Sequence, residues 1–130
     1  MRYNPAMRRK SERGQALVEI ALLLPMLAMI ALGVVDLGRA YFAFTTVTNA
    51  AREGAACASL GSLCPAGPTA AVTAEVNGQL PGGVTTTVTG GASRGSNVTV
   101  TVDYSFQAQT ALILGQSTFP IRASATMVVQ

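Results

Sequence analysis

The chain contains no histidine and no tryptophan, and only 12% of its 130 residues are charged. Without histidine it cannot form a Ser-His-Asp or Cys-His nucleophile. The acidic residues Glu53, Glu75 and Asp103 fall on separate predicted elements, so no pair of carboxylates is available for general acid–base catalysis. We therefore predict no catalytic residue and no enzymatic activity.

Metal and cofactor sites lack their usual residues as well. The only cysteines are Cys57 and Cys64, and two thiolates without histidine do not complete a tetrahedral zinc site. The glycine-rich stretch 90–95 has neither the lysine nor the strand-to-helix context of a phosphate-binding loop, and a flexible hairpin connection explains it better. We expect no metal, no cofactor and no small-molecule substrate.

Positive charge is concentrated at the N-terminus. Residues 1–14 carry five basic side chains and one acidic one, whereas the remainder of the chain has a net charge of −1. Nucleic-acid binding needs basic residues clustered on a folded face, usually with aromatic neighbours. The body of this chain has no such cluster, so we expect no nucleic-acid partner.

The longest apolar run extends from Ala16 to Val35, and Glu19 is its only charged residue. A helix rising ~1.5 Å per residue would cover roughly 30 Å over this run, the hydrocarbon thickness of a bilayer. Signal peptides have shorter apolar cores of about 7–15 residues. Here the helical pattern continues after the run, which predicts a retained single-pass span in contact with membrane lipid. The positive-inside rule places residues 1–14 in the cytoplasm and the chain after about Asp36 across the cytoplasmic (inner) membrane.

The two cysteines fall in the part predicted to be exported, where disulfide bridges form and persist. A bridge between Cys57 and Cys64 would close a short loop just after the first helix. Two unpaired thiols are the alternative.

Periodicity divides the chain into residues 1–14, a basic leader expected to be disordered or removed, residues 15–60, a long helix, and residues 61–130, a small extracytoplasmic head. The second half of the helix carries a stripe of small residues that permits close approach of a neighbouring element. The stripe consists of Val47, Ala50, Ala51, Gly54, Ala55 and Ala58.

The head has one helical segment and three alternating ones. Val72, Val76 and Leu80 predict a short helix over about 69–79, ended by Pro81 and two glycines. Beyond it, apolar residues alternate along 84–88, 98–106 and 119–129, which predicts three antiparallel strands with one apolar face. Three strands cannot cover that face alone, so it must pack on the helical stripe or the short helix. The predicted fold class is α+β: a long N-terminal transmembrane, pilin-like helix with a head of one short helix and a three-stranded antiparallel sheet.

Glu19 needs its own explanation, because a carboxylate in a membrane helix is costly unless it reaches the interface or finds a cation. Its plain interpretation is a residue at headgroup depth. Its position relative to Gly14 suggests more, because cleavage after Gly14 would make Gln15 the first residue and Glu19 the fifth.

These residues carry a family resemblance. The basic leader, Gly14, Glu19 and the apolar helix resemble the processing signal of type IV prepilins. More narrowly, Gly14–Pro25, the Asp36–Arg39 segment and the stripe at Ala50–Ala56 resemble the TadE-like family of the tight-adherence (Tad/Flp) pilus system. The resemblance covers about residues 14–58.

The resemblance implies a minor pilin or pseudopilin of pilus assembly, cut after Gly14 by a membrane aspartic prepilin peptidase. It implies as partners that peptidase, other pilin-like subunits and the Tad assembly platform. The Glu19 carboxylate would pair with the N-terminal amine of an adjacent subunit, and the product would stay in the inner membrane or enter a surface pilus. The alternative is an uncleaved, signal-anchored envelope protein whose head binds a partner or a surface.

Three further features concern the helix. Pro25 lies inside the span and is expected to kink the helix or free a carbonyl group. Asp36 and Arg39 are expected to form a surface ion pair at the outer edge of the bilayer. The aromatic residues that follow are expected to form an interfacial belt. They are Tyr41, Phe42 and Phe44.

Overall fold

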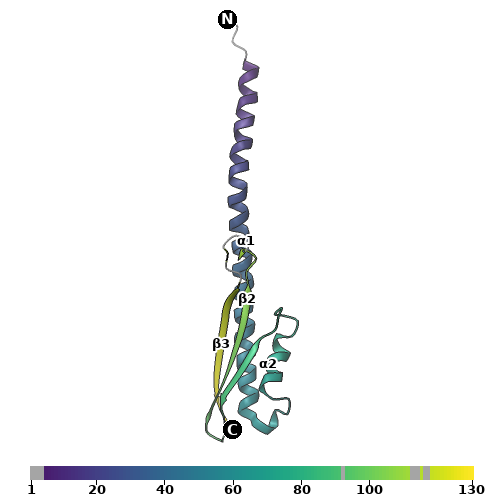
Figure 1. The fold of residues 1–130 in the computed structure, drawn as a ribbon, viewed down its shortest axis with the longest axis vertical. Helices are drawn as coiled ribbons and strands as arrows, with labels where there is room; N and C mark the ends of the chain where they lie inside the picture. The colour runs from purple at the N-terminus through teal and green to yellow at the C-terminus, as the bar shows by residue number, and fades with distance from the viewer. Residues whose placement is uncertain (1–4, 92, 112–114, 116–117) are drawn as a thin grey trace. The chain divides into compact units, whose positions relative to one another are not determined.

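A computed structural model describes residues 5–91, 93–111, 115 and 118–130, with side chains described from Gly14 onward. Its elements follow in the order α1, η1, α2, β1, β2 and β3 (Figure 1). Their bounds are α1 Pro5–Leu60, η1 Gly61–Leu63, α2 Pro68–Val76, β1 Thr85–Gly90, β2 Asn97–Gln107 and β3 Thr118–Val128. The predicted α+β fold is confirmed: a long N-terminal helix with a head of one short helix and a three-stranded antiparallel sheet.

Helix α1 begins ten residues earlier than the predicted start at Gln15, because Pro5 is its first residue. Proline suits the first turn of a helix, where its missing N–H has no intrahelical partner. The residues that follow include alanine, arginine and lysine, which favour helix. The backbone from Pro5 onward is helical. The expectation that the leader is disordered or removed stays a prediction.

The chain forms two compact units, Met1–Val35 and Asp36–Gln130. In the first unit, α1 is the described element, and every described side chain from Gly14 to Val35 is exposed. The second unit contains the rest of α1 together with η1, α2 and the sheet. The second half of the helix is thus part of the head's own folded unit.

The sheet has β2 at its centre, with β1 and β3 antiparallel on either side. Alternate β2 side chains are buried, as the period of two predicts. They are Val98, Val100, Val102, Tyr104 and Phe106. On β3, Ile121 and Met127 are only half-buried, and Phe119 is exposed. The sheet's apolar face is therefore covered best along its central strand.

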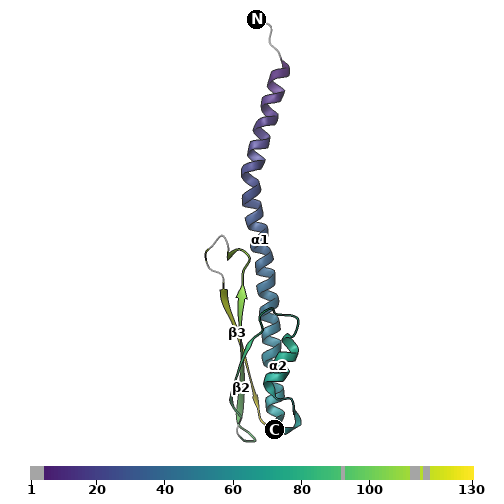
Figure 2. The same ribbon diagram turned by 45° about the vertical axis from the view of Figure 1, so that its right-hand side comes forward.

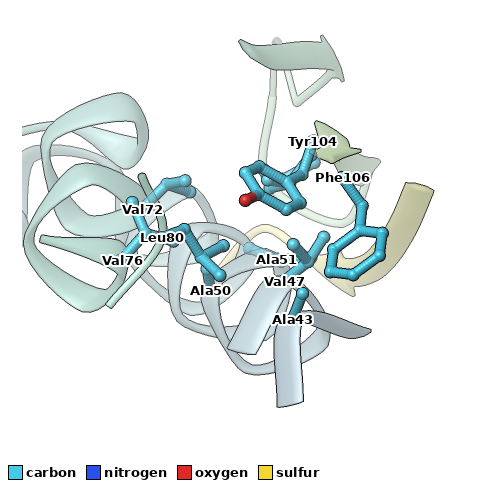
Figure 3. Close-up of a cluster of buried hydrophobic side chains, with 12 residues drawn as sticks. Ala43, Val47, Ala50, Ala51, Val72, Val76, Leu80, Tyr104 and Phe106 are labelled. Carbon is cyan, nitrogen blue, oxygen red and sulfur yellow. The ribbon is translucent and has the colours of Figure 1, made fainter. Parts of the chain in front are cut away.

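The stripe of small residues on α1 faces the sheet and α2. Val47, Ala50, Ala51 and Ala55 are almost completely buried in one cluster with residues of α2 and β2. Figure 3 shows Tyr104 and Phe106 close to the α1 residues Ala43, Val47 and Ala51. Short side chains on α1 leave room for these large rings, which is the close approach that the stripe predicts.

Helix α2 packs beside the second half of α1 in both ribbon views (Figures 1 and 2). Val72 and Val76 are buried, and Leu80 joins the same cluster just beyond the helix. The helix ends at Val76 rather than near Gln79, because Asn77 is already extended with a ψ of 124° and Gly78 follows with a positive φ of 75°. The hydroxyl of Thr46 on α1 donates to Gln79 Oε1 at 3.4 Å, which ties this turn to α1.

Candidate processing and assembly site

The residues of the predicted processing site lie along one part of α1. Gly14, Gln15 and Glu19 line an open surface depression together with Val18 and Leu22. A Cβ placed on Gly14 would have no described neighbour within 4 Å, so no packing against the described residues explains this glycine. Gln15 and Glu19 are one helical turn apart, and both are exposed. Gly14, Gln15 and Glu19 are thus all exposed on α1.

The apolar run behind Glu19 is exposed on all sides of the helix. Its large side chains between Leu17 and Val35 have exposed fractions from 40% at Leu32 to 75% at Leu22. A helix that is apolar all round needs lipid or other helices around it. By length and composition, the segment Gly14–Leu63 contains a helix able to cross a membrane.

Pro25 lies inside α1, and the helix continues past it. Proline has no N–H to donate to the carbonyl group four residues earlier, that of Ala21. In a membrane a neighbouring helix or a Ser/Thr side chain can satisfy such a group. The kink at Pro25 stays a prediction.

Asp36, the first residue of the second unit, holds the segment that follows β2. Its side chain is buried and accepts hydrogen bonds from the backbone N–H of Gln109 at 3.0 Å and of Thr110 at 2.7 Å. The Thr110 hydroxyl donates to the same carboxylate at 2.7 Å. One carboxylate therefore fastens α1 to the chain leaving the central strand. We call this arrangement the Asp36 clamp.

The clamp stabilises the ionised form of Asp36. Hydrogen bonds from the backbone of Thr110 and then Gln109 lower its pKa from 3.8 to about 2, with smaller contributions from the Thr110 hydroxyl and Arg39. Desolvation opposes this shift but is outweighed. The carboxylate is thus charged throughout the physiological pH range.

Arg39 completes the clamp. Its guanidinium donates to Asp36 Oδ1 at 3.1 Å and lies 5.4 Å from the centre of the Phe106 ring. The predicted i, i+3 ion pair exists, but the expectation of a surface pair is wrong for Asp36, whose side chain is only 9% exposed. Gln109 and Thr110 cover the carboxylate.

Sequence reasoning missed the clamp. The partners of Asp36 lie 73 and 74 positions further along the chain, beyond any local pattern. One signal was available: an acidic residue directly after an apolar span is costly unless its charge is satisfied. That signal predicts that Asp36 has a hydrogen-bond or ionic partner, but it does not identify the partner.

The two cysteines meet at the end of α1. Cys57, on the last turns of the helix, is joined to Cys64, just after η1, by a disulfide with a Cα–Cα distance of 5.3 Å. The backbone N–H of the terminal residue Gln130 donates to the Ser59 carbonyl at 3.0 Å within the same stretch. The segment just after η1 and the C-terminal residue are therefore both bonded to the last turns of α1.

The outer aromatic residues are exposed. Tyr41 is 70% exposed, and Phe42 and Phe44 are about half exposed. Their placement in an interfacial belt stays a prediction. Among the described residues, no group of three or more metal-ligating side chains comes together.

Comparison with known proteins shows a similarity over the N-terminal part of the chain. Residues 14–56 match the family model described as TadE-like protein, in agreement with the resemblance carried by Gly14, Glu19 and the small-residue stripe. The matched region contains the apolar helix and the whole stripe except Ala58, while the sheet and α2 lie outside it. No curated protein and no solved structure matches the chain. The match suggests a component related to the Tad pilus with an N-terminal apolar helix.

Proposed function

We propose that this chain, TadE-like over residues 14–56, is a minor pilin- or pseudopilin-like component of tight-adherence (Flp) pilus assembly. The observation that carries the proposal is the register of Gly14 and Glu19 in front of an apolar helix exposed on every side. An apolar surface of this kind suits two environments in turn, the bilayer before assembly and a bundle of neighbouring helices after it.

Processing is the first step of the proposed pathway. A membrane prepilin peptidase cuts the peptide bond after Gly14 on the cytoplasmic side and leaves a free amine on Gln15. The cut removes five basic residues and one acidic residue, a net charge of +4. The helix that remains has lost most of the positive charge that held its end in the cytoplasm.

Assembly is the second step. The Glu19 carboxylate pairs with the Gln15 amine of an adjacent processed subunit as the helices pack. Either charge alone would be costly in an apolar bundle, and pairing offsets this desolvation. The exposure of Glu19 and Gln15 on α1 supports this role.

The head takes its place across the inner membrane, where its disulfide can form. The Asp36 clamp lies at the first residue of the head unit, so the head is fastened to α1 directly after the predicted span. Its partners in this scheme are other pilin-like subunits and the assembly platform.

The test is intact mass and N-terminal sequencing of the membrane-embedded full-length chain, with and without a co-expressed prepilin peptidase. We expect a new N-terminus at Gln15 that appears only with the peptidase and is lost in Gly14→Val. A matched control, Gly33→Val, changes a second helical glycine without described neighbours and should leave cleavage intact.

The opposite result supports the second candidate, an uncleaved envelope anchor. The observation that favours it is the unbroken helix from Pro5 through Gly14, which leaves no extended segment at the cut site. If the original N-terminus persists where a known prepilin is cut, the processing proposal fails and Glu19 becomes an interfacial residue.

A further inference from the structure

The asparagines of the chain differ in the residue that follows each of them. Asn4 precedes a proline, Asn49 an alanine and Asn97 a valine, whereas Asn77 precedes Gly78. The backbone nitrogen of the following residue can attack the asparagine side-chain amide and close a five-membered succinimide ring. A side chain on that residue hinders the attack, and proline has no N–H to lose. The step from Asn77 to Gly78 is therefore the least hindered in the chain.

The backbone around this step lies outside regular structure. Helix α2 ends at Val76, Asn77 is extended with a ψ of 124°, and Gly78 has a φ of 75°. Both residues are exposed, and a Cβ on Gly78 would have no described neighbour within 4 Å. Among the described residues, no hydrogen bond joins the Gly78 N–H to a partner. The attacking nitrogen is thus open to water.

The other two asparagines described by the structure lie in rigid backbone. Asn49 lies inside α1, and the next residue, Ala50, is completely buried. Asn97 is the first residue of β2, where it pairs with Val128, and the next residue, Val98, is 2% exposed. Ring closure requires a rotation of ψ at the asparagine. The hydrogen bonds of a helix or a sheet oppose that rotation.

Fewer backbone bonds oppose the same rotation at Asn77. The N–H groups of Gln79 and Leu80 both donate to the Val76 carbonyl, at 3.0 and 3.3 Å, and these bonds span the step. Helix ends fray more readily than helix interiors. The turn after α2 can therefore open while α1 and the sheet stay folded.

We propose that Asn77 is a site of spontaneous modification, at which the chain forms aspartate and isoaspartate. The Gly78 nitrogen gives its proton to hydroxide and attacks Asn77 Cγ, so a Cγ–N bond forms. The Cγ–Nδ2 bond breaks, and the side-chain nitrogen takes up a proton from water and leaves as ammonia. Water then opens the ring at either carbonyl group. One opening gives aspartate, and the other gives isoaspartate, in which the main chain passes through the former side chain.

Both products change the junction between α2 and α1. A new negative charge at position 77 lies at the C-terminal end of α2, where the helix dipole disfavours it. Isoaspartate also adds a methylene carbon to the backbone between Val76 and Leu80, which are both buried. It displaces Gln79, which accepts a hydrogen bond from Thr46 on α1. The site does not depend on the proposed function, because cleaved and uncleaved chains carry the same head.

The test is peptide mapping by mass spectrometry of the full-length chain in detergent, after incubation at about pH 7 and about pH 9. Asn49 and Asn97 are controls within the same sample. We expect deamidation at Asn77 to be at least about tenfold faster than at either control. The rate should rise about tenfold for each added pH unit, because the attacking nitrogen must lose its proton. Labelling by an isoaspartate methyltransferase detects the isoaspartate product.

Two glycine variants test the chemistry of the step. Gly78→Ala hinders the attack and should lower the rate at Asn77 by at least about tenfold, even if the alanine loosens the turn, because the hindrance is local. Gly82→Ala is the matched control, since Gly82 also has a positive φ, 87°, and open space around it. It should leave the rate unchanged. Equal rates at Asn77 and Asn97 in the folded chain, or an unchanged rate in Gly78→Ala, would overturn the proposal.

Discussion

At the residue scale, Gly54 sets the distance between α1 and the rest of the head. A Cβ at this position would lie 2.6 Å from Val72 Cγ2 and 3.1 Å from Val100 Cγ1. Both valines are completely buried and have little room to move. The absence of one carbon atom thus lets α1, α2 and β2 meet.

We predict that Gly54→Ala lowers the free energy of unfolding of the head by about 1–3 kcal/mol through overpacking, although alanine is the better helix former. Arg52→Ala, an exposed change on the same turn, is the control and should have little effect. Thermal unfolding of the full chain in detergent measures both. Equal stability of the two variants would show that Val72 and Val100 can move to accommodate the added Cβ.

The Asp36 clamp gives a pH prediction. The folded-state pKa of Asp36, about 2, lies below its ordinary value of 3.8. The clamp therefore contributes its full stability above about pH 4 and loses it as the pH falls towards about 2. In Asp36→Asn, the amide keeps one acceptor oxygen and presents an NH2 group in place of the other, so either the Gln109 or the Thr110 N–H loses its acceptor.

We predict that Asp36→Asn is less stable than wild type at pH 7 and that the difference shrinks between about pH 4 and 2. Melting temperatures across this range, measured for both proteins, isolate Asp36 from the other carboxylates. A constant difference at all pH values would contradict the assigned pKa shift.

At the element scale, the end of α1 is secured by covalent and hydrogen bonds. The disulfide joins Cys57 to Cys64 across η1, and Gln130 bonds to Ser59 between them. A bridge across a short loop stabilises mainly by restricting the unfolded chain.

We predict that the double change Cys57→Ser with Cys64→Ser lowers the free energy of unfolding of the head by about 2–3 kcal/mol. Cys57 is 4% exposed, so the new hydroxyl also enters an apolar site. Comparing this variant with reduced wild type separates the two causes, because reduction breaks the bridge without adding a hydroxyl. If reduced and oxidised wild type have the same free energy of unfolding, the disulfide does not stabilise the head.

Local patterns were sufficient for most elements. Alternation of valines located β2, and the four-residue spacing of Val72 and Val76 located α2. The basic leader has no apolar period, so the sequence predicts that α1 starts at Gln15, whereas the helix begins at Pro5. That reasoning failed since a helix needs no apolar face when its residues have good propensity and a proline begins it.

At the scale of the whole molecule, a substitution of Glu19 tests the proposed assembly role separately from membrane anchoring. We predict that Glu19→Ala is inserted and cut after Gly14 as in wild type but fails to enter a fibre, because the Gln15 amine of the neighbour loses its partner. Fractionation of sheared fibres from membranes, with antibody detection of the head, measures incorporation. Leu22→Ala, a change in the same surface depression, is the control. Normal incorporation of Glu19→Ala would exclude the pairing role.

The sequence by itself determined the apolar span, the Gly14–Glu19 register, the small-residue stripe and the three alternating strands. All of these are local, since each depends on the spacing of neighbouring residues along one element. The tertiary structure alone decided which carboxylate is buried and at which glycine an added Cβ would clash. Asp36 finds its donors in Gln109 and Thr110, and Gly54 meets Val72 and Val100, because folding brings distant segments together. The donors of Asp36 leave no periodic trace in the chain, and the stripe that contains Gly54 predicts a close approach without identifying Val72 or Val100 as the neighbours.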